Sequence, residues 1–138
     1  GALLCVLPLF TSCSEEETIF NFNVKAQRYT TGPDNEVICE TIASYLREEG
    51  IIDRQFSKHV EGSVDINSEE VNQLLQATVQ EVIDRLNDID YQAVLRDAGI
   101  TVTPGRPEIS IYFSVQMVDA NGNVWKESPL IYTLNFDL

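Results

Sequence analysis

Four side chains in this 138-residue sequence belong to types that often perform chemistry: one histidine and three cysteines. His59 has no second histidine with which to share a metal ion, and no partner for a catalytic arrangement can be assigned to it from the sequence. Cys39 has no evident base nearby in the sequence, and small buried thiols are common in protein cores. We therefore expect no catalytic residue, no metal and no cofactor.

One acidic segment has a superficial likeness to a calcium-binding loop. Asp119, Asn121 and Asn123 have the spacing of the first three ligands of such a loop. However, Val124 stands where the loop needs glycine, and Leu130 stands where it needs the closing glutamate. We interpret this segment as the turn of a β-hairpin.

Cys13 follows an uncharged apolar run, residues 2–10, and two small residues, Thr11 and Ser12. The run is shorter than the roughly 20 residues that a membrane-spanning helix needs, but it has the length of the apolar part of a secretory signal. Export peptidases need small side chains just before the cut, because the backbone must lie extended in their active site. The pattern predicts that residues 1–12 are removed and that Cys13 carries lipid.

The residues around Cys13 also resemble a known processing site. Phe10-Thr11-Ser12-Cys13 resembles the lipobox of bacterial prolipoproteins, with Phe in place of the usual Leu, and Ser14-Glu15-Glu16-Glu17 follows it. A serine and an acidic run in that place resemble the export tag of surface lipoproteins in Bacteroidetes-type bacteria. The resemblance covers residues 1–17. It implies an acylated Cys13, carrying fatty acids such as palmitate, and an outward-facing place on the outer membrane of a Gram-negative bacterium. It implies nothing about activity.

The alternative is that residues 2–10 form a core strand and Glu15, Glu16 and Glu17 a solvated loop. If the signal reading holds, residues 13–17 are anchor and acidic tether, and residues 18–138 are a single domain. Cys5 is then lost with the signal, so Cys39 is the remaining thiol and no disulfide can form within the chain.

The charge balance limits the partners of this domain. Nine basic against 22 acidic residues give a net charge of −13. Such a surface repels phosphate backbones, which argues against nucleic-acid binding. It also offers no polybasic attraction to anionic lipid, so contact with a membrane must come from the lipid anchor.

Hydrophobic periodicity predicts the first half of the domain. Residues 18–26 alternate between apolar and polar, as in a half-buried strand. Residues 34–49 have a helical apolar stripe, with Asp34 as candidate N-cap and Gly50 as the stop. Residues 51–66 follow neither period.

Two further helices follow. Asn67 with Glu70 resembles a capping box. The apolar stripe after it, residues 71–86, is the strongest helical pattern in the chain. A short helix over about residues 91–98 ends at Gly99.

The C-terminal residues predict a hairpin. Residues 109–117 and 124–138 alternate, and Asn121-Gly122 between them is the preferred pair for a two-residue type I′ turn. Such a turn pairs residues whose numbers sum to 243, which brings the apolar positions opposite each other: Phe113 and Leu130, Ile111 and Tyr132, Ile109 and Leu134. Pro129 cannot donate to a ladder, so the last strand is an edge or bulges there.

The predicted order is β-α-α-(α)-β-β with one apolar face on each strand. This order favours an α+β fold, a two-layer sandwich with helices on one face of a mainly antiparallel sheet.

The other face of the hairpin is the predicted binding patch. The same register places Val118 opposite Trp125, Gln116 opposite Glu127 and Tyr112 opposite Ile131. Aromatic rings beside polar side chains suit a glycan or a protein ligand. Alternatively, residues 51–66 or a second chain cover this face, or Trp125 only supports the hairpin.

We therefore expect a surface-anchored, non-enzymatic binding or interaction module. The alternative is a structural component of an envelope or surface assembly, for which an edge strand would serve as a joining surface. A hydrolase or inhibitor acting at the cell surface ranks third. The sequence names no specific ligand.

Overall fold

The structure, a computed structural model, describes residues 17–29, 33–102 and 109–134. Cys13, Ser14, Glu15 and Glu16 lie outside the described residues, as does the C-terminal part of the expected strand 124–138. Among the described residues, no helix is long and apolar enough to cross a membrane.

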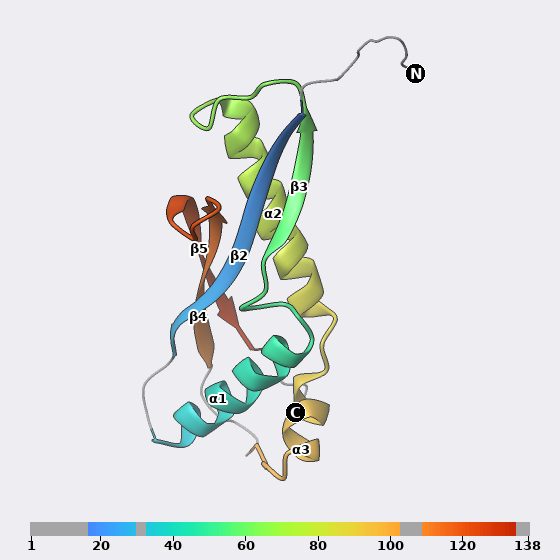
Figure 1. The fold of residues 1–138 in the computed structure, drawn as a ribbon. Helices are drawn as coiled ribbons and strands as arrows, with labels where there is room; N and C mark the ends of the chain where they lie inside the picture. Colours follow the sequence, from blue (N-terminus) through green and yellow to red (C-terminus); the bar gives the residue numbers. More distant parts are fainter. Residues whose placement is uncertain (1–16, 30–32, 103–108, 135–138) are drawn as a thin grey trace.

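The described residues form an α+β fold, as the sequence predicts. The elements follow the order β2 (Glu17–Tyr29), α1 (Pro33–Glu48), β3 (Phe56–Glu61), α2 (Glu69–Asn87), α3 (Tyr91–Asp97), β4 (Ser110–Val118) and β5 (Val124–Thr133). The strands form one antiparallel sheet in the order β3-β2-β4-β5. Helix α2 runs behind β2 and β3, and α1 and α3 pack together at one end of the sheet (Figure 1).

A single core lies between the helices and one face of the sheet. Alternate residues of the two central strands enter it, including Phe20, Phe22, Phe113 and Met117, each at most 2% exposed. The helices contribute their apolar stripes to the same cluster. The other face of the sheet contributes nothing to this cluster, which is the arrangement expected of a two-layer sandwich.

The order of elements differs from the prediction in one place, because β3 forms within the ambiguous residues 51–66. Phe56, Lys58 and Val60 are its half-buried positions and alternate with exposed ones. Lys58 interrupts the apolar alternation, and its ammonium group pairs with Glu81 of α2. An edge strand buries only part of its inner face, so it tolerates a lysine whose stem is apolar and whose head reaches a carboxylate.

The helix ends follow their capping residues, with two corrections. Helix α1 begins at Pro33, so Asp34 lies inside the helix and is not its N-cap; proline is favoured in a first turn. The N-cap of α2 is Ser68, whose hydroxyl accepts from the backbone N–H of Val71, and not Asn67. After α1, Gly50 has φ +73° and donates to the carbonyl of Arg47, as in a Schellman motif.

The hairpin keeps the predicted register along most of its length. From Ser110↔Thr133 to Met117↔Lys126 the paired numbers sum to 243, but Val118 pairs with Val124. The turn is therefore longer than the predicted two-residue type I′ turn. The N–H of Gly122, at φ +85°, donates to the carbonyl of Asp119, and a bulge follows in β5.

Candidate binding face

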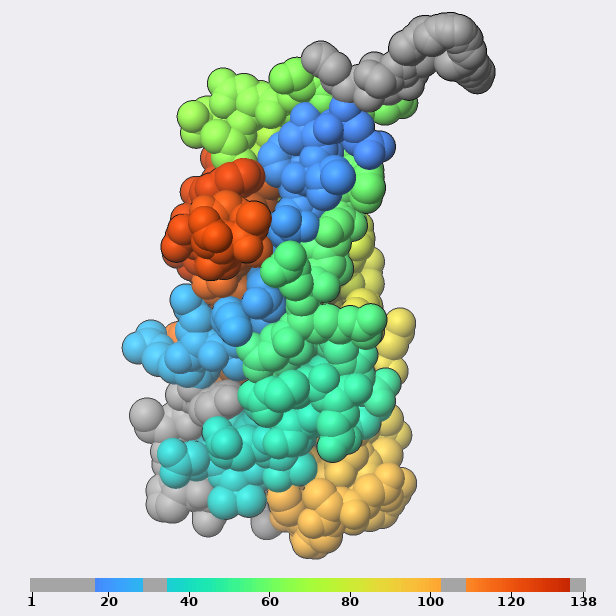
Figure 2. All heavy atoms as spheres, viewed as in Figure 1, coloured from blue at the N-terminus to red at the C-terminus, as the bar shows by residue number. Residues whose placement is uncertain are grey.

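The face of the sheet away from the core is the surface on which the sequence places its binding patch. Figure 2 shows this face, formed by β2, β3 and the β4–β5 hairpin, with α1 and α3 below. Its exposed large apolar side chains on β5 are Val124 at 44%, Trp125 at 52% and Ile131 at 62%. β3, which forms within residues 51–66, does not cover this patch, because it pairs with β2 at the opposite edge of the sheet from β5.

The bulge in β5 places two consecutive residues on this open face. Lys126 points toward the helices, since its Nζ donates to Asn72 of α2 at 2.8 Å. Alternation then places Trp125 on the open face. Val124 lies on the same face because it pairs with Val118, which follows core-facing Met117 on β4. The prediction that Val118 faces Trp125 is therefore wrong in its pairing, although Trp125 is on the predicted face.

Val118 itself is not part of the accessible patch. It is only 5% exposed and lies outside the main core cluster. On either side it pairs with Asn21 of β2 and Val124 of β5. It supports the exposed residues beside it and offers a ligand little surface of its own.

The predicted pair of Tyr112 and Ile131 is present in the structure, and Arg28 of β2 extends it to a row of three residues. Tyr112 pairs with Ile131 on one side and with Arg28 of β2 on the other. The guanidinium carbon of Arg28 lies 4.7 Å from the centroid of the Tyr112 ring. This cation–π contact occupies one face of the ring and leaves Ile131 as the exposed apolar member of the row.

Polar side chains occupy the middle of the face. Gln116 pairs with Glu127, as predicted, and Gln116 is half-buried. The hydroxyl of Ser114 donates to the Glu127 carboxylate at 2.6 Å. Ser114 is only 1% exposed, so this bond satisfies a buried hydroxyl and directs the Glu127 carboxylate across the strand.

Strand β5 is one of the two edge strands of the described sheet, and Pro129 lies in the middle of it. The backbone N–H of Leu134 donates to Ile109, so even-numbered residues of β5 direct their N–H groups toward β4. Pro129 is odd-numbered, and its missing N–H falls on the outer edge. The proline therefore leaves the internal ladder intact and interrupts the row of outward donors.

The structure places His59 at the surface of β3 and Cys39 in the core. The Nδ1 atom of exposed His59 lies 2.9 Å from a carboxylate oxygen of Glu17, the last residue of the predicted export tag and the first of β2. Cys39 is fully buried on α1. Among the described residues, no group of three His, Cys, Asp or Glu side chains is placed to hold a metal ion.

Comparison with known proteins found no matching family model, no similar curated protein and no similar solved structure. We therefore infer function from the residues of this chain. Two features of the face were not predicted. Val124 joins it through a bulge, and Arg28 reaches Tyr112 through a β2–β4 pairing that no local pattern specifies.

Proposed function

We propose that this protein is a lipid-anchored interaction module of the outer membrane, facing outward, that binds a protein partner through the open face of its sheet. The observation that carries the proposal is the exposure of Trp125, Val124 and Ile131 on the face of β5 that points away from the helices. Large apolar side chains gathered on one surface are typical of interaction sites. The proposal includes no enzymatic activity.

A protein partner is favoured over a glycan by the state of the aromatic residues. Sugar-binding sites stack the sugar ring on an accessible aromatic face, but Arg28 covers one face of Tyr112. The remaining exposed large side chains of β5 are one aromatic, Trp125, and two aliphatics. Aliphatic and tryptophan side chains together suit the apolar centre of a protein interface. Because the chain carries a net charge of −13, we expect the partner surface to be neutral or basic.

The alternative role, a structural component joined by strand addition, receives less support. Strand addition needs a continuous row of outward backbone donors. Pro129 interrupts that row in the middle of β5, and the bulge at Trp125 disturbs it near the turn. The side chains of the face are therefore better suited to binding than the backbone of the edge.

The proposed anchor has a geometric consequence for this face. Three residues separate Cys13 from the first residue of β2, so an extended chain keeps Glu17 within about 14 Å of Cys13. The hairpin turn lies toward the same end of the sheet, because Asn21 pairs with Val118. Along β5, Ile131 is therefore farther from a lipid-anchored Cys13 than Trp125 is, and it is the better position for a probe.

Site-specific photo-crosslinking on intact cells tests the proposal. A photoreactive phenylalanine analogue at position 131 should give a discrete protein crosslink. The same analogue at Ser44, an exposed position on α1, should not. Trp125→Asp should remove the crosslink at position 131. Identical products from both positions would contradict the proposal, and so would Trp125-dependent binding to glycans without a protein crosslink.

A further inference from the structure

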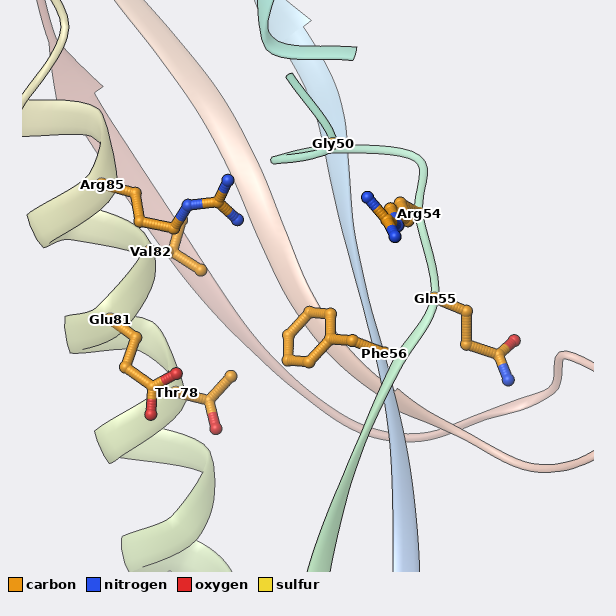
Figure 3. A pocket seen from close by; sticks show the side chains of 8 residues that line it. All are labelled: Gly50, Arg54, Gln55, Phe56, Thr78, Glu81, Val82 and Arg85. Atoms are coloured by element: carbon orange, nitrogen blue, oxygen red, sulfur yellow. The ribbon is translucent and has the colours of Figure 1, made fainter. Parts of the chain in front are cut away.

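A second surface with ligand-binding character lies on the helix side of the sheet, apart from the open face. A pocket of about 330 Å³ opens where the chain between α1 and β3 approaches α2. It is lined by Gly50, Arg54, Gln55, Phe56, Thr78, Glu81, Val82 and Arg85 (Figure 3). This volume is at the lower end of the range for small-molecule sites.

Two arginines dominate the polar part of the pocket. Arg54 and Arg85 approach it from opposite walls, with the Phe56 ring between them (Figure 3). Neither forms an ion pair with any described residue. Acidic residues outnumber basic ones by 22 to 9, yet no carboxylate of the described residues lies within ion-pair distance of either guanidinium group. The pocket is therefore a positive site on an acidic protein.

Other basic residues nearby are already paired. Lys25 and Arg47 both bind the carboxylate of Asp53, at 3.1 and 2.8 Å. The carboxylate of Glu81, which also lines the pocket, is bound by Lys58. The negative charge of Glu81 is thus offset by a lysine, and the charge of the two arginines is not.

Both arginines are positioned by backbone groups. A Cβ atom added at Gly50 would lie 2.8 Å from Nη1 of Arg54 and 3.2 Å from its Cδ, so the Arg54 side chain packs directly on the glycine. Nη2 of Arg85 donates to the backbone carbonyl of Glu49 at 3.3 Å. That bond uses one of the five N–H donors of a guanidinium and leaves the others for a ligand.

Phe56 and Val82 form the apolar part of the lining. The Phe56 ring stacks on Phe22, with centroids 5.6 Å apart and planes 15° apart, which leaves its other side for the pocket. Val82 is buried beside it, and the Thr78 hydroxyl is used in a bond to the carbonyl of Leu74. The pocket therefore offers guanidinium donors on two sides and an apolar surface between them.

We infer that this pocket binds a small organic carboxylate with an aromatic or branched apolar body. A guanidinium group binds a carboxylate through two parallel N–H···O bonds, and the apolar body would pack on Phe56 and Val82. An organic carboxylate is favoured over inorganic phosphate because phosphate has no apolar body to pack on Phe56 and Val82. The lining of this pocket shares no residue with the exposed residues of β5 on the open face.

Titration of the purified full chain with benzoate, followed by amide NMR shifts, tests the inference. Benzoate should bind saturably, with a Kd on the order of 1 mM, and should shift the amide signals of Gly50, Phe56 and Thr78. Benzamide has the same ring without the charge, and acetate has the charge without the ring. Each should bind at least about tenfold more weakly, because each lacks one of the two kinds of contact.

Variants assign the binding to the pocket. Arg54→Ala and Arg85→Ala should each weaken benzoate binding about tenfold or more, and Arg85→Lys should restore part of it. Arg96→Ala is the matched control and should leave the affinity unchanged, because Arg96 lies on α3 outside this pocket. Trp125→Ala should also have no effect. Unsaturable shifts, benzoate binding unaffected by Arg54→Ala and Arg85→Ala, or preferential binding of inorganic phosphate would overturn the inference.

Discussion

Arg28 lies over the ring of Tyr112, with its guanidinium carbon 4.7 Å from the ring centroid. The two residues are neighbours across β2 and β4, next to a register shift between Ala26 and Arg28. The shift omits Gln27 from the pairing and brings Arg28 opposite Tyr112. A bulge in one strand thus determines which side of an aromatic ring in the next strand stays accessible.

This contact should contribute modestly to stability. Arg28→Ala removes the cation and should lower the free energy of unfolding by about 0.5–1 kcal/mol, the range for exposed cation–π pairs. Arg28→Lys should recover part of the loss. Chemical denaturation of the three proteins measures this; equal midpoints would show that the contact contributes nothing.

Trp125 should matter for binding and little for folding. It is 52% exposed and occupies a bulge, so Trp125→Ala should cost less than about 1 kcal/mol. Phe113→Ala, at a position 1% exposed, should cost roughly 3–5 kcal/mol and serves as the comparison. Melting curves of both variants check this. A large fall in the midpoint for Trp125→Ala would make Trp125 a structural residue and end its role as a binding residue.

The ion pairs of Asp53 should make the stability of the protein depend on pH in the acidic range. The hydrogen bond from Arg47 is the largest influence on its pKa; burial partly opposes it, Lys25 adds to it, and the net effect lowers the pKa below its usual value of 3.8. A lowered pKa in the folded state means that the stabilisation is present above the unfolded pKa and is lost as pH falls through the folded pKa.

Asp53→Asn is the appropriate variant, because asparagine also tolerates the φ of +57° at this position. At neutral pH the variant should be less stable by no more than about 1 kcal/mol, since the ion pairs are exposed. The difference should vanish below the folded pKa. Denaturant midpoints between neutral and acidic pH measure it, and a pH-independent difference would exclude the ion pairs as its cause.

Removal of the proposed anchor should release the protein. Cys13→Ala should give an unprocessed or soluble product, because the acidic domain has no other evident attraction to a membrane. Metabolic labelling with a fatty acid checks this. Cys39→Ala, which leaves the lipobox unchanged, is the control for thiol acylation. Persistent labelling of Cys13→Ala would refute the anchor.

The test of the proposed export tag should separate Glu17, the first residue of β2, from Glu15 and Glu16. Combined Glu15→Ala and Glu16→Ala should keep the lipid but reduce surface exposure, as measured by protease accessibility on intact cells. Glu17→Ala should be made separately, because its carboxylate contacts His59 and it begins β2. Unchanged accessibility in both glutamate variants, the double and the single, would count against the tag.

The sequence by itself determined the α+β class, the helices and most of the hairpin register. The reason is that periodicity is a local property: the alternation of Ile109, Ile111 and Phe113 and the stripe of α2 each need one buried face, whatever lies opposite. The glycine after α1 was predictable in the same way, since its positive φ ends a helix in any context.

Tertiary structure alone decided β3, the bulge and the arginine pocket. Lys58 disrupts the pattern of β3, and the strand forms because β2 offers it a ladder and Glu81 offers its lysine a partner. The pairing of Val118 with Val124 depends on the turn that closes around Asp119. Arg54 and Arg85 lie far apart in the sequence, and only the packing of α2 against β3 brings them to one pocket. β3 and the pocket depend on contacts between distant residues, and the bulge depends on the hydrogen bonds of one turn; apolar periodicity encodes neither.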